Sequence, residues 1–234
     1  MTASKVSKKR LLDSKRKLVA KYDPKSPISE QYRTIRTNIL YSSVDEEIRS
    51  LMVTSSGPGE GKSTTTANLA VVFAQQGKTV LLIDADLRKP TVHYTFKLTN
   101  NTGLTSVLTN QIGLMEAVNK TDENNLYVLP SGPIPPNPSE LLGSRAMKQF
   151  MEQVSEEFDL VIFDTPPVLA VTDAQILGNL CQGSVLVVSS GKTEKDSLMK
   201  TKELLNTTNG RVLGVVLNNK KIDKKSNYYY YGTN

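Results

Sequence analysis

Residue types that serve many active sites are scarce in this sequence. Cys181 is the only cysteine among 234 residues, so an internal disulfide is excluded and a reducing compartment is expected. His93 is the only histidine, which excludes a histidine metal cluster and a histidine-based catalytic triad. We expect Cys181 to be a small buried hydrophobe and His93 to lie at the surface or in a loop.

Long apolar runs are also missing. No run approaches the roughly 18–20 residues that span a bilayer, and no apolar stretch follows the cationic start of the chain as it would in a signal peptide. We therefore expect a cytoplasmic protein that reaches the inner face of the plasma membrane only through a partner.

Positive charge is concentrated at one end of the chain. The net charge is +6, but residues 1–21 alone sum to +7 and leave the remainder nearly neutral. This uneven distribution argues against a nucleic-acid partner. The basic start is either a solvated arm or a segment that contacts an anionic membrane, where each cation held near the lipid contributes roughly 1 kcal/mol.

Composition divides the chain into a basic flexible arm at 1–27, a domain at 28–219 and a tyrosine-rich flexible tail at 220–234. Ser29 is the expected N-cap of a helix at 28–41. Short apolar strands are expected at 50–55, 78–83, 126–129, 159–163, 184–189 and 212–217. Helices are expected between them at 62–76, 104–109, 113–119, 139–157, 172–179 and 194–206. This alternation predicts a doubly wound α/β fold, with a mostly parallel central sheet and helices on both faces.

A glycine-rich turn follows the first expected strand and opens a helix. It matches the phosphate-binding pattern of Gly, four residues and Gly-Lys-Ser/Thr, except that Ser56 replaces the first glycine. Backbone N–H groups of such a loop surround phosphate oxygens at the positive end of the helix. We expect Lys62 to reach the β- and γ-phosphates of ATP and the Ser63 hydroxyl to bind Mg²⁺. The expected nucleotide-binding residues are Gly57, Pro58, Gly59, Glu60, Gly61, Lys62, Ser63 and Thr64.

Three aspartates stand at the ends of two later strands. Asp84 and Asp86 follow the strand at 78–83, and Asp164 follows the strand at 159–163. Ligands of open α/β sheets bind outside the carboxyl ends of the strands, where these acids would lie. Carboxylate oxygens are the hard ligands that Mg²⁺ prefers, directly or through water. The loop and the acids together predict a Mg·ATP site.

These motifs resemble the cytoplasmic bacterial tyrosine kinases of capsule and exopolysaccharide biosynthesis (BY-kinases), a deviant-Walker branch of the P-loop ATPases. The likeness covers nearly the whole chain from about residue 26, and no eukaryotic kinase signature is present. The matching segments are the phosphate loop at 56–64, the Asp-x-Asp-x-Arg run at 84–88, the Asp-Thr-Pro-Pro run at 164–167, the Glu-x-x-Arg-x-x-Arg run at 30–36, the proline run at 135–142 and the tyrosine cluster at 228–231.

The resemblance implies an ATP- and Mg²⁺-dependent protein-tyrosine kinase. Lys62 would stabilise the transferring phosphoryl group, while Asp86 and Asp164 would hold the metal together with Ser63. Asp84 is the candidate base for the tyrosine proton, but Asp84 and Asp86 can exchange these roles because both point the same way on an extended strand. Relatives of this class often bind the adenine at the position of Asn218.

The resemblance also implies assembly and partners. Glu30, Arg33 and Arg36 match the family's self-assembly segment and share roughly one face of the expected helix. A mobile tail can place one hydroxyl after another in line with a γ-phosphate, so we expect autophosphorylation in trans within a homo-oligomer, besides phosphorylation of other proteins. The family further implies a membrane modulator that activates the kinase, and a phosphotyrosine phosphatase. The tail tyrosines are Tyr228, Tyr229, Tyr230 and Tyr231.

Two other functions remain open on the motifs alone. Septum-positioning and plasmid-partition ATPases share the fold but carry a signature Lys-Gly pair where this chain has Gly57 and Pro58. The second alternative is a regulatory subunit that binds nucleotide without productive chemistry. Transfer of γ-phosphate to tyrosine would separate the kinase from both.

Overall fold

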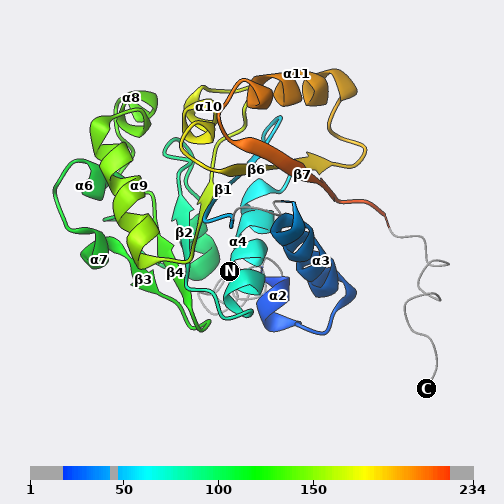
Figure 1. The fold of residues 1–234 in the computed structure, drawn as a ribbon, viewed down its shortest axis with the longest axis horizontal. Coiled ribbons are helices and arrows are strands. Elements are labelled where there is room, and N and C mark those ends of the chain that lie inside the picture. The colour runs from blue at the N-terminus through cyan, green and yellow to red at the C-terminus, as the bar shows by residue number, and fades with distance from the viewer. Residues whose placement is uncertain (1–17, 43–46, 222–234) are drawn as a thin grey trace, which may run out of the picture.

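A computed structural model describes residues 18–42 and 47–221 and contains one seven-stranded sheet (Figure 1). The strand order is β3-β4-β2-β5-β1-β6-β7. All neighbouring strands are parallel except β3 and β4. The strands are β1 Ser50–Ser55, β2 Val80–Asp84, β3 Asn119–Lys120, β4 Leu126–Leu129, β5 Leu160–Asp164, β6 Gly183–Ser189 and β7 Arg211–Asn218. The doubly wound, mostly parallel fold predicted from the sequence is confirmed.

Most helices lie where the alternating pattern predicted them. The helices are α2 Val19–Tyr22, α3 Pro27–Tyr41, α4 Lys62–Ala74, α5 Val92–Phe96, α6 Leu104–Leu108, α7 Leu114–Ala117, α8 Pro138–Leu142, α9 Arg145–Glu157, α10 Asp173–Gly178 and α11 Lys195–Asn206. The single helix expected at 139–157 is wrong, because the chain breaks at Gly143 and restarts where the Ser144 side chain accepts a hydrogen bond from Met147 N.

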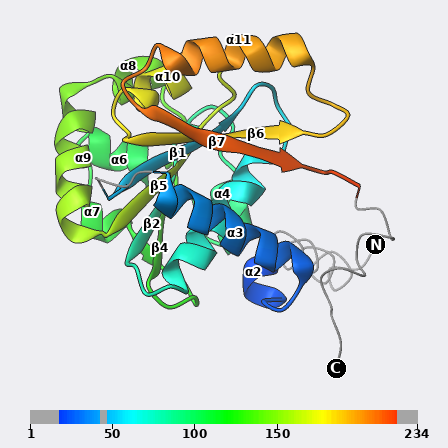
Figure 2. The same ribbon diagram turned by 45° about the vertical axis from the view of Figure 1, so that its right-hand side comes forward.

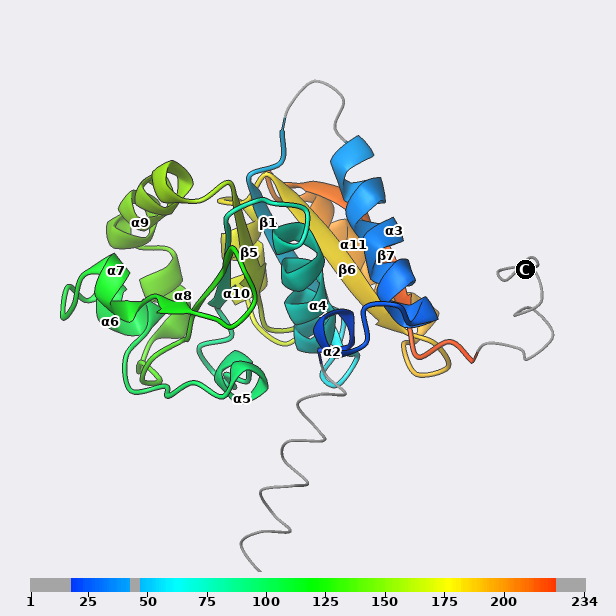
Figure 3. The ribbon, with the colours of Figure 1, turned by 90° about the horizontal axis from the view of Figure 1, so that it is seen from below.

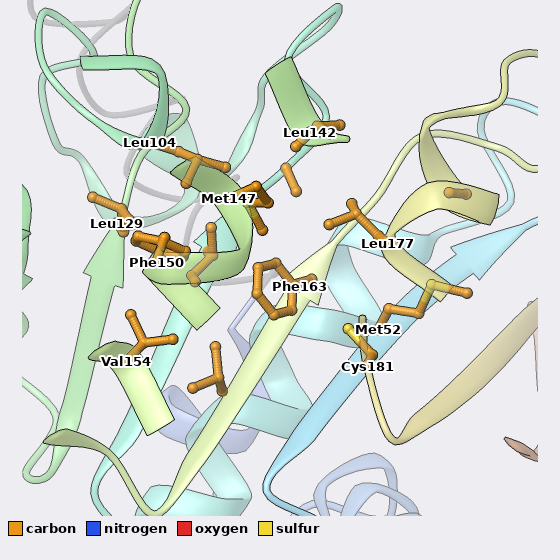
Figure 4. Close-up of a cluster of buried hydrophobic side chains, with 14 of the residues drawn as sticks. Met52, Leu104, Leu129, Leu142, Met147, Phe150, Val154, Phe163, Leu177 and Cys181 are labelled. Carbon is orange, nitrogen blue, oxygen red and sulfur yellow. The ribbon is translucent and has the colours of Figure 1, made fainter. Parts of the chain in front are cut away.

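Two apolar cores hold the sheet between its helices. Figure 2 shows α10 and α11 on one side of the sheet and α2, α3 and α4 on the other. Fully buried strand residues such as Met52 and Phe163 face the first side, together with Met147 and Phe150 of α9 (Figure 4). Cys181 joins this core and is 4% exposed, as expected of a small buried hydrophobe. Burial raises the pKa of its thiol far above the usual range.

The N-terminal side of the fold differs from the sequence prediction in two ways. Part of the segment assigned to the flexible arm forms α2, whose Ala20 is fully buried and donates its backbone N–H to Asn68 Oδ1 at 2.9 Å. The N-cap of α3 is Ser26 instead of Ser29, because Pro27 is favourable at the first position of a helix. The Ser26 hydroxyl accepts a hydrogen bond from the Ser29 backbone N–H. Residues 19–22, which the sequence analysis assigned to the arm, are therefore packed against the domain.

His93 also differs from the expectation. It lies on α5, a short helix that the sequence pattern did not predict, and it is only 8% exposed. Burial lowers the pKa of its imidazole. Among the described residues, no helix has the length and apolar character needed to cross a membrane.

Candidate active site

The candidate site lies at the carboxyl end of three adjacent strands. β1 runs into the phosphate-binding loop, which ends at Gly61 and opens α4. β2 and β5 lie side by side in parallel, and their register places Asp84 directly opposite Asp164. Strand pairing therefore brings together a loop and two carboxylates from segments that are distant in sequence.

Glycine is required at the end of the loop. Gly61 has a φ of 98°, in the left-handed region that side chains with a Cβ rarely adopt. A Cβ at this position would also lie 2.0 Å from Asn218 Nδ2, which donates to the Glu60 carbonyl at 2.9 Å. Asn218, predicted to bind adenine, therefore also fixes the loop backbone.

Two further side chains hold the loop in place, and sequence reasoning missed both. Lys192, after β6, donates its ammonium to the carbonyls of Pro58 and Gly59 at 2.8 and 3.2 Å. Thr201 on α11 donates to Ser56 Oγ at 2.9 Å. Neither residue belongs to a recognisable motif, so no local signal could have identified them.

Lys62 lies between two of the predicted acids. Its Nζ is 3.0 Å from Asp86 Oδ2 and 3.4 Å from Asp164 Oδ1, and it also contacts Ser63 Oγ at 3.3 Å. Burial lowers the pKa of Lys62, but the charges of Asp164 and Asp86 outweigh this effect, so that its pKa is raised. The ammonium is therefore charged and aimed at the edge of the sheet where phosphates are expected.

Asp84 lies in a different environment from Asp86. It is fully buried, and its Oδ2 accepts the backbone N–H groups of Thr91 and Val92, both at 2.9 Å. Its Oδ1 has no hydrogen-bond partner within the described chain. Burial, followed by the nearby charge of Asp164, raises the pKa of Asp84 to about 8. Asp86 instead binds Lys62 and accepts from Lys89 N at 3.0 Å.

The site has open positions for a metal ion. Asp164 Oδ2, like Asp84 Oδ1, is buried and lacks a partner among the described residues, and burial raises the pKa of Asp164. Buried carboxylate oxygens are costly to leave unpaired, and a cation beside Asp164 and a proton donor beside Asp84 would each satisfy one of them. The same part of the chain contains no cluster of three or more His, Cys, Asp and Glu side chains that would hold a metal by itself. The residues therefore fit Mg²⁺ that completes its shell with the Ser63 hydroxyl, phosphate oxygens and water.

A hydrogen-bond network that the sequence analysis did not predict holds the segment that follows Asp86. Arg88 binds the carboxylate of Asp173 through both its Nε and Nη2, at 2.9 and 3.0 Å. Asp173 is fully buried and also accepts from Ser139 Oγ at 2.8 Å. The Asp-x-Asp-x-Arg run is thereby connected to α8 and α10.

The predicted assembly residues lie on α3, away from this cluster. Glu30 and Arg33 form an exposed ion pair, and Arg33 also donates to Pro24 O at 2.8 Å. Arg36 instead donates to Val72 O of α4 at 2.7 Å. Figure 3 shows α3 beside α4. The three residues therefore do not share one solvent face. The tyrosines Tyr228 to Tyr231 lie outside the described residues.

This combination of loop, lysine and strand-end carboxylates places the chain among the P-loop nucleotide-binding proteins. A family model described as an AAA domain matches residues 48–213. Tyrosine-protein kinase YwqD of Bacillus subtilis is 61% identical over 218 residues, which cover 93% of this chain and 92% of the relative. Putative tyrosine-protein kinase CapB of Staphylococcus aureus is 45% identical over 89% of this chain and 91% of its own.

A solved structure is similar to this chain over most of its length. The chimerical protein CapA2B2 superposes with a TM-score of 0.86 at 46% identity, over 88% of this chain and 91% of that one. The chain therefore belongs to the bacterial tyrosine kinases, as its motifs predicted, and is a protein-tyrosine kinase.

Proposed function

We propose that this kinase transfers the γ-phosphate of Mg·ATP to tyrosines of its own C-terminal tail, in trans, and to other proteins. The observation that carries the proposal is the position of the Lys62 ammonium, between two carboxylates at the phosphate-binding loop. In the proposed complex the loop N–H groups and Lys62 would surround the phosphates, and Asn218, which lies beside Gly61, would contact the adenine.

Each acid then has a separate role in the transfer. Asp86 and Asp164, with the Ser63 hydroxyl, would hold Mg²⁺, and the ion would supply positive charge to the phosphate oxygens. The phenolic oxygen attacks the γ-phosphorus, the bond to the β–γ bridging oxygen breaks, and ADP leaves. Asp84 accepts the phenolic proton through its unpaired Oδ1, because its Oδ2 is engaged by two backbone N–H groups.

The raised pKa of Asp84 supports its choice as the base over Asp86. With a pKa raised to about 8, the ionised fraction of Asp84 is a stronger base than a carboxylate of ordinary pKa, and this value lies within about one unit of neutral pH. Asp86 is less suited to this role, since one of its oxygens binds Lys62 and the other binds the Lys89 N–H.

The biological setting that we propose follows the family. The kinase is cytoplasmic and is recruited to the inner face of the plasma membrane by a membrane modulator that activates it. It regulates capsule or exopolysaccharide production, and a phosphotyrosine phosphatase reverses its action. Each tail phosphate adds about −1.5 to −2 charges at pH 7. Several phosphates would bring negative charge near Asp84, Asp86 and Asp164, expel the tail and loosen the homo-oligomer.

A radiolabel experiment tests the chemistry. With γ-labelled ATP, label should appear on tyrosine in the wild type, and Lys62→Met should reduce the transfer rate about 10²–10³-fold, as expected for one lost transition-state contact. Autophosphorylation by Lys62→Met at near the wild-type rate would refute the assignment. Release of all label as free phosphate would favour a partition-type ATPase instead.

A further inference from the structure

The backbone of the phosphate-binding loop between Gly57 and Glu60 offers few donors to an anion. The Gly57 N–H is already bound to Glu60 Oε1 at 3.1 Å, and Pro58 has no N–H. The N–H groups that remain in this segment are those of Gly59 and Glu60. Neither of them donates to another group among the described residues. These two are therefore the donors that this part of the loop can give to phosphate oxygens.

Lys192 holds the carbonyl ends of the same two peptide units. Its Nζ donates to the Pro58 carbonyl at 2.8 Å and to the Gly59 carbonyl at 3.2 Å. The Pro58 carbonyl shares a peptide unit with the Gly59 N–H, and the Gly59 carbonyl shares one with the Glu60 N–H. In a trans peptide the C=O and the N–H point in opposite directions. One ammonium that binds both carbonyls therefore turns both N–H groups away from itself.

The connection from β6 into α11 fixes the position of Lys192. Gly191 has a φ of 72°, in the left-handed region, and the Lys192 N–H donates to the Ser189 carbonyl at 3.1 Å. The Ser189 N–H in turn donates to Thr193 Oγ1 at 2.9 Å. The loop also admits the ammonium, because a Cβ at Gly59 would lie only 2.9 Å from Lys192 Nζ. Both sides of this contact are thus shaped for it.

Lys192 approaches the loop from a side other than the one expected to face phosphate. Its side chain lines a hollow of about 460 Å³ beside the loop. Lys62 and Ser63, the residues expected at the phosphates and the metal, do not line this hollow. A direct contact is not needed for an effect on phosphate, because a cation bound to a carbonyl polarises the peptide unit and strengthens its N–H as a donor.

We propose that Lys192 is a positioning residue for phosphate binding, which aims the N–H groups of Gly59 and Glu60 at the phosphates of the nucleotide. The proposal deepens the proposed function and rests on it only as far as Mg·ATP binding. It does not depend on which tyrosine receives the phosphate, so binding of Mg·ADP is a sufficient readout.

Calorimetric titration of the full chain with Mg·ADP tests the effect on affinity. Lys192→Met should raise the Kd about five- to tenfold, because the hydrogen bonds of one exposed charged group are lost. Lys192→Arg should restore most of the affinity, since arginine supplies a cation with several donors. Lys195→Met is the control, because Lys195 is exposed at the start of α11 and makes no hydrogen bond to the loop.

Nuclear magnetic resonance can observe the peptide unit itself. Pro58–Gly59 is the only Pro-Gly pair in the sequence. A chain with ¹³C at the proline carbonyls and ¹⁵N at the glycines therefore gives one correlated signal from this unit. Saturating Mg·ADP should shift the Gly59 N–H signal in the wild type and shift it less in Lys192→Met. The Pro58 carbonyl signal should already differ in the nucleotide-free variant, because its donor is gone.

Two results would overturn the proposal. One is an unchanged Mg·ADP affinity in a folded Lys192→Met chain. The other is weaker binding with a Gly59 shift equal to that of the wild type, because the loss would then arise elsewhere. A wild-type chain that binds Mg·ADP but places no phosphate on its tail would refute the proposed transfer and leave this assignment of Lys192 intact.

Discussion

At the scale of single residues, the active-site cluster shows how one strand end gives two aspartates different chemistry. Asp84 and Asp86 are two positions apart, yet one is fully buried against backbone N–H groups and the other binds Lys62. The sequence could place both beside the phosphate loop, because parallel strands end at a common edge. It could not separate their roles, since the environment of each carboxylate comes from residues on other elements.

The anchor of the Asp-x-Asp-x-Arg run gives a stability prediction. Arg88→Ala would leave the buried Asp173 carboxylate with the Ser139 hydroxyl as its side-chain donor among the described residues. We expect a loss of about 1.5–3 kcal/mol in the free energy of unfolding, toward the lower value because the Arg88 side chain is 39% exposed. Urea denaturation measures the loss. The control is Arg145→Ala, an exposed arginine expected to change stability by less than about 0.5 kcal/mol. Equal losses in the two variants would show that the anchor does not contribute.

The buried histidine gives a pH prediction. Because burial lowers the pKa of His93, the folded chain resists protonation, whereas the unfolded chain binds a proton near pH 6.5. Stability should therefore be lost as the pH falls from about 7 through 6.5 toward the lower folded-state pKa. The raised pKa values of Asp84 and Asp164 have the opposite effect, because they increase the stability of the folded chain as the pH falls. Both aspartates are present in the wild type and in His93→Phe, so their effect cancels when the two chains are compared. The variant should lose less stability on acidification in urea titrations. Parallel curves for the two chains would contradict the prediction.

At the scale of elements, the strands were predicted well because each is a short apolar run. All six expected strands are present, and they end within two residues of the predicted positions. The missed features depend on long-range contacts. Lys192 reaches a loop 134 residues earlier, and Arg88 binds Asp173 85 residues later, so spacing along the chain carries no trace of either contact. The split between α8 and α9 was missed because one apolar stripe of α9 suggested a continuous helix.

The contacts of α3 refine the assembly hypothesis. Arg36 fixes α3 to the α4 backbone, whereas Glu30 and Arg33 are paired on the outer surface. If that outer surface forms the self-assembly contact, Arg33→Ala should yield monomers in light scattering while the free energy of unfolding changes by less than about 1 kcal/mol. ATP binding should be retained. Arg36→Ala should instead lower stability by about 1 kcal/mol through the lost Val72 hydrogen bond. An Arg33→Ala chain with the wild-type oligomer size would rule out this surface.

At the scale of the whole molecule, mixed assemblies of two variants can show whether phosphate is transferred within one subunit or between subunits. One chain carries Lys62→Met and keeps its tyrosines, and the other is active but lacks residues 228–231. If the tail of one subunit enters the site of its neighbour, the inactive chain should gain phosphotyrosine only when both are present. Transfer should depend on the contact between copies, because a tethered neighbour raises the local concentration of the tail.

The α3 surface supplies the control for this experiment. Adding Arg33→Ala to both chains should abolish transfer in the mixture without lowering ATP binding. The side-chain partners of Arg33 are Glu30 and the Pro24 carbonyl, which do not belong to the loop cluster, so only the encounter between copies is removed. Chains that still transfer after their oligomer is lost would point to diffusive encounters rather than assembly. An inactive chain that stays unphosphorylated while mixed oligomers form would exclude transfer in trans, and the tail would then have to reach the site of its own subunit.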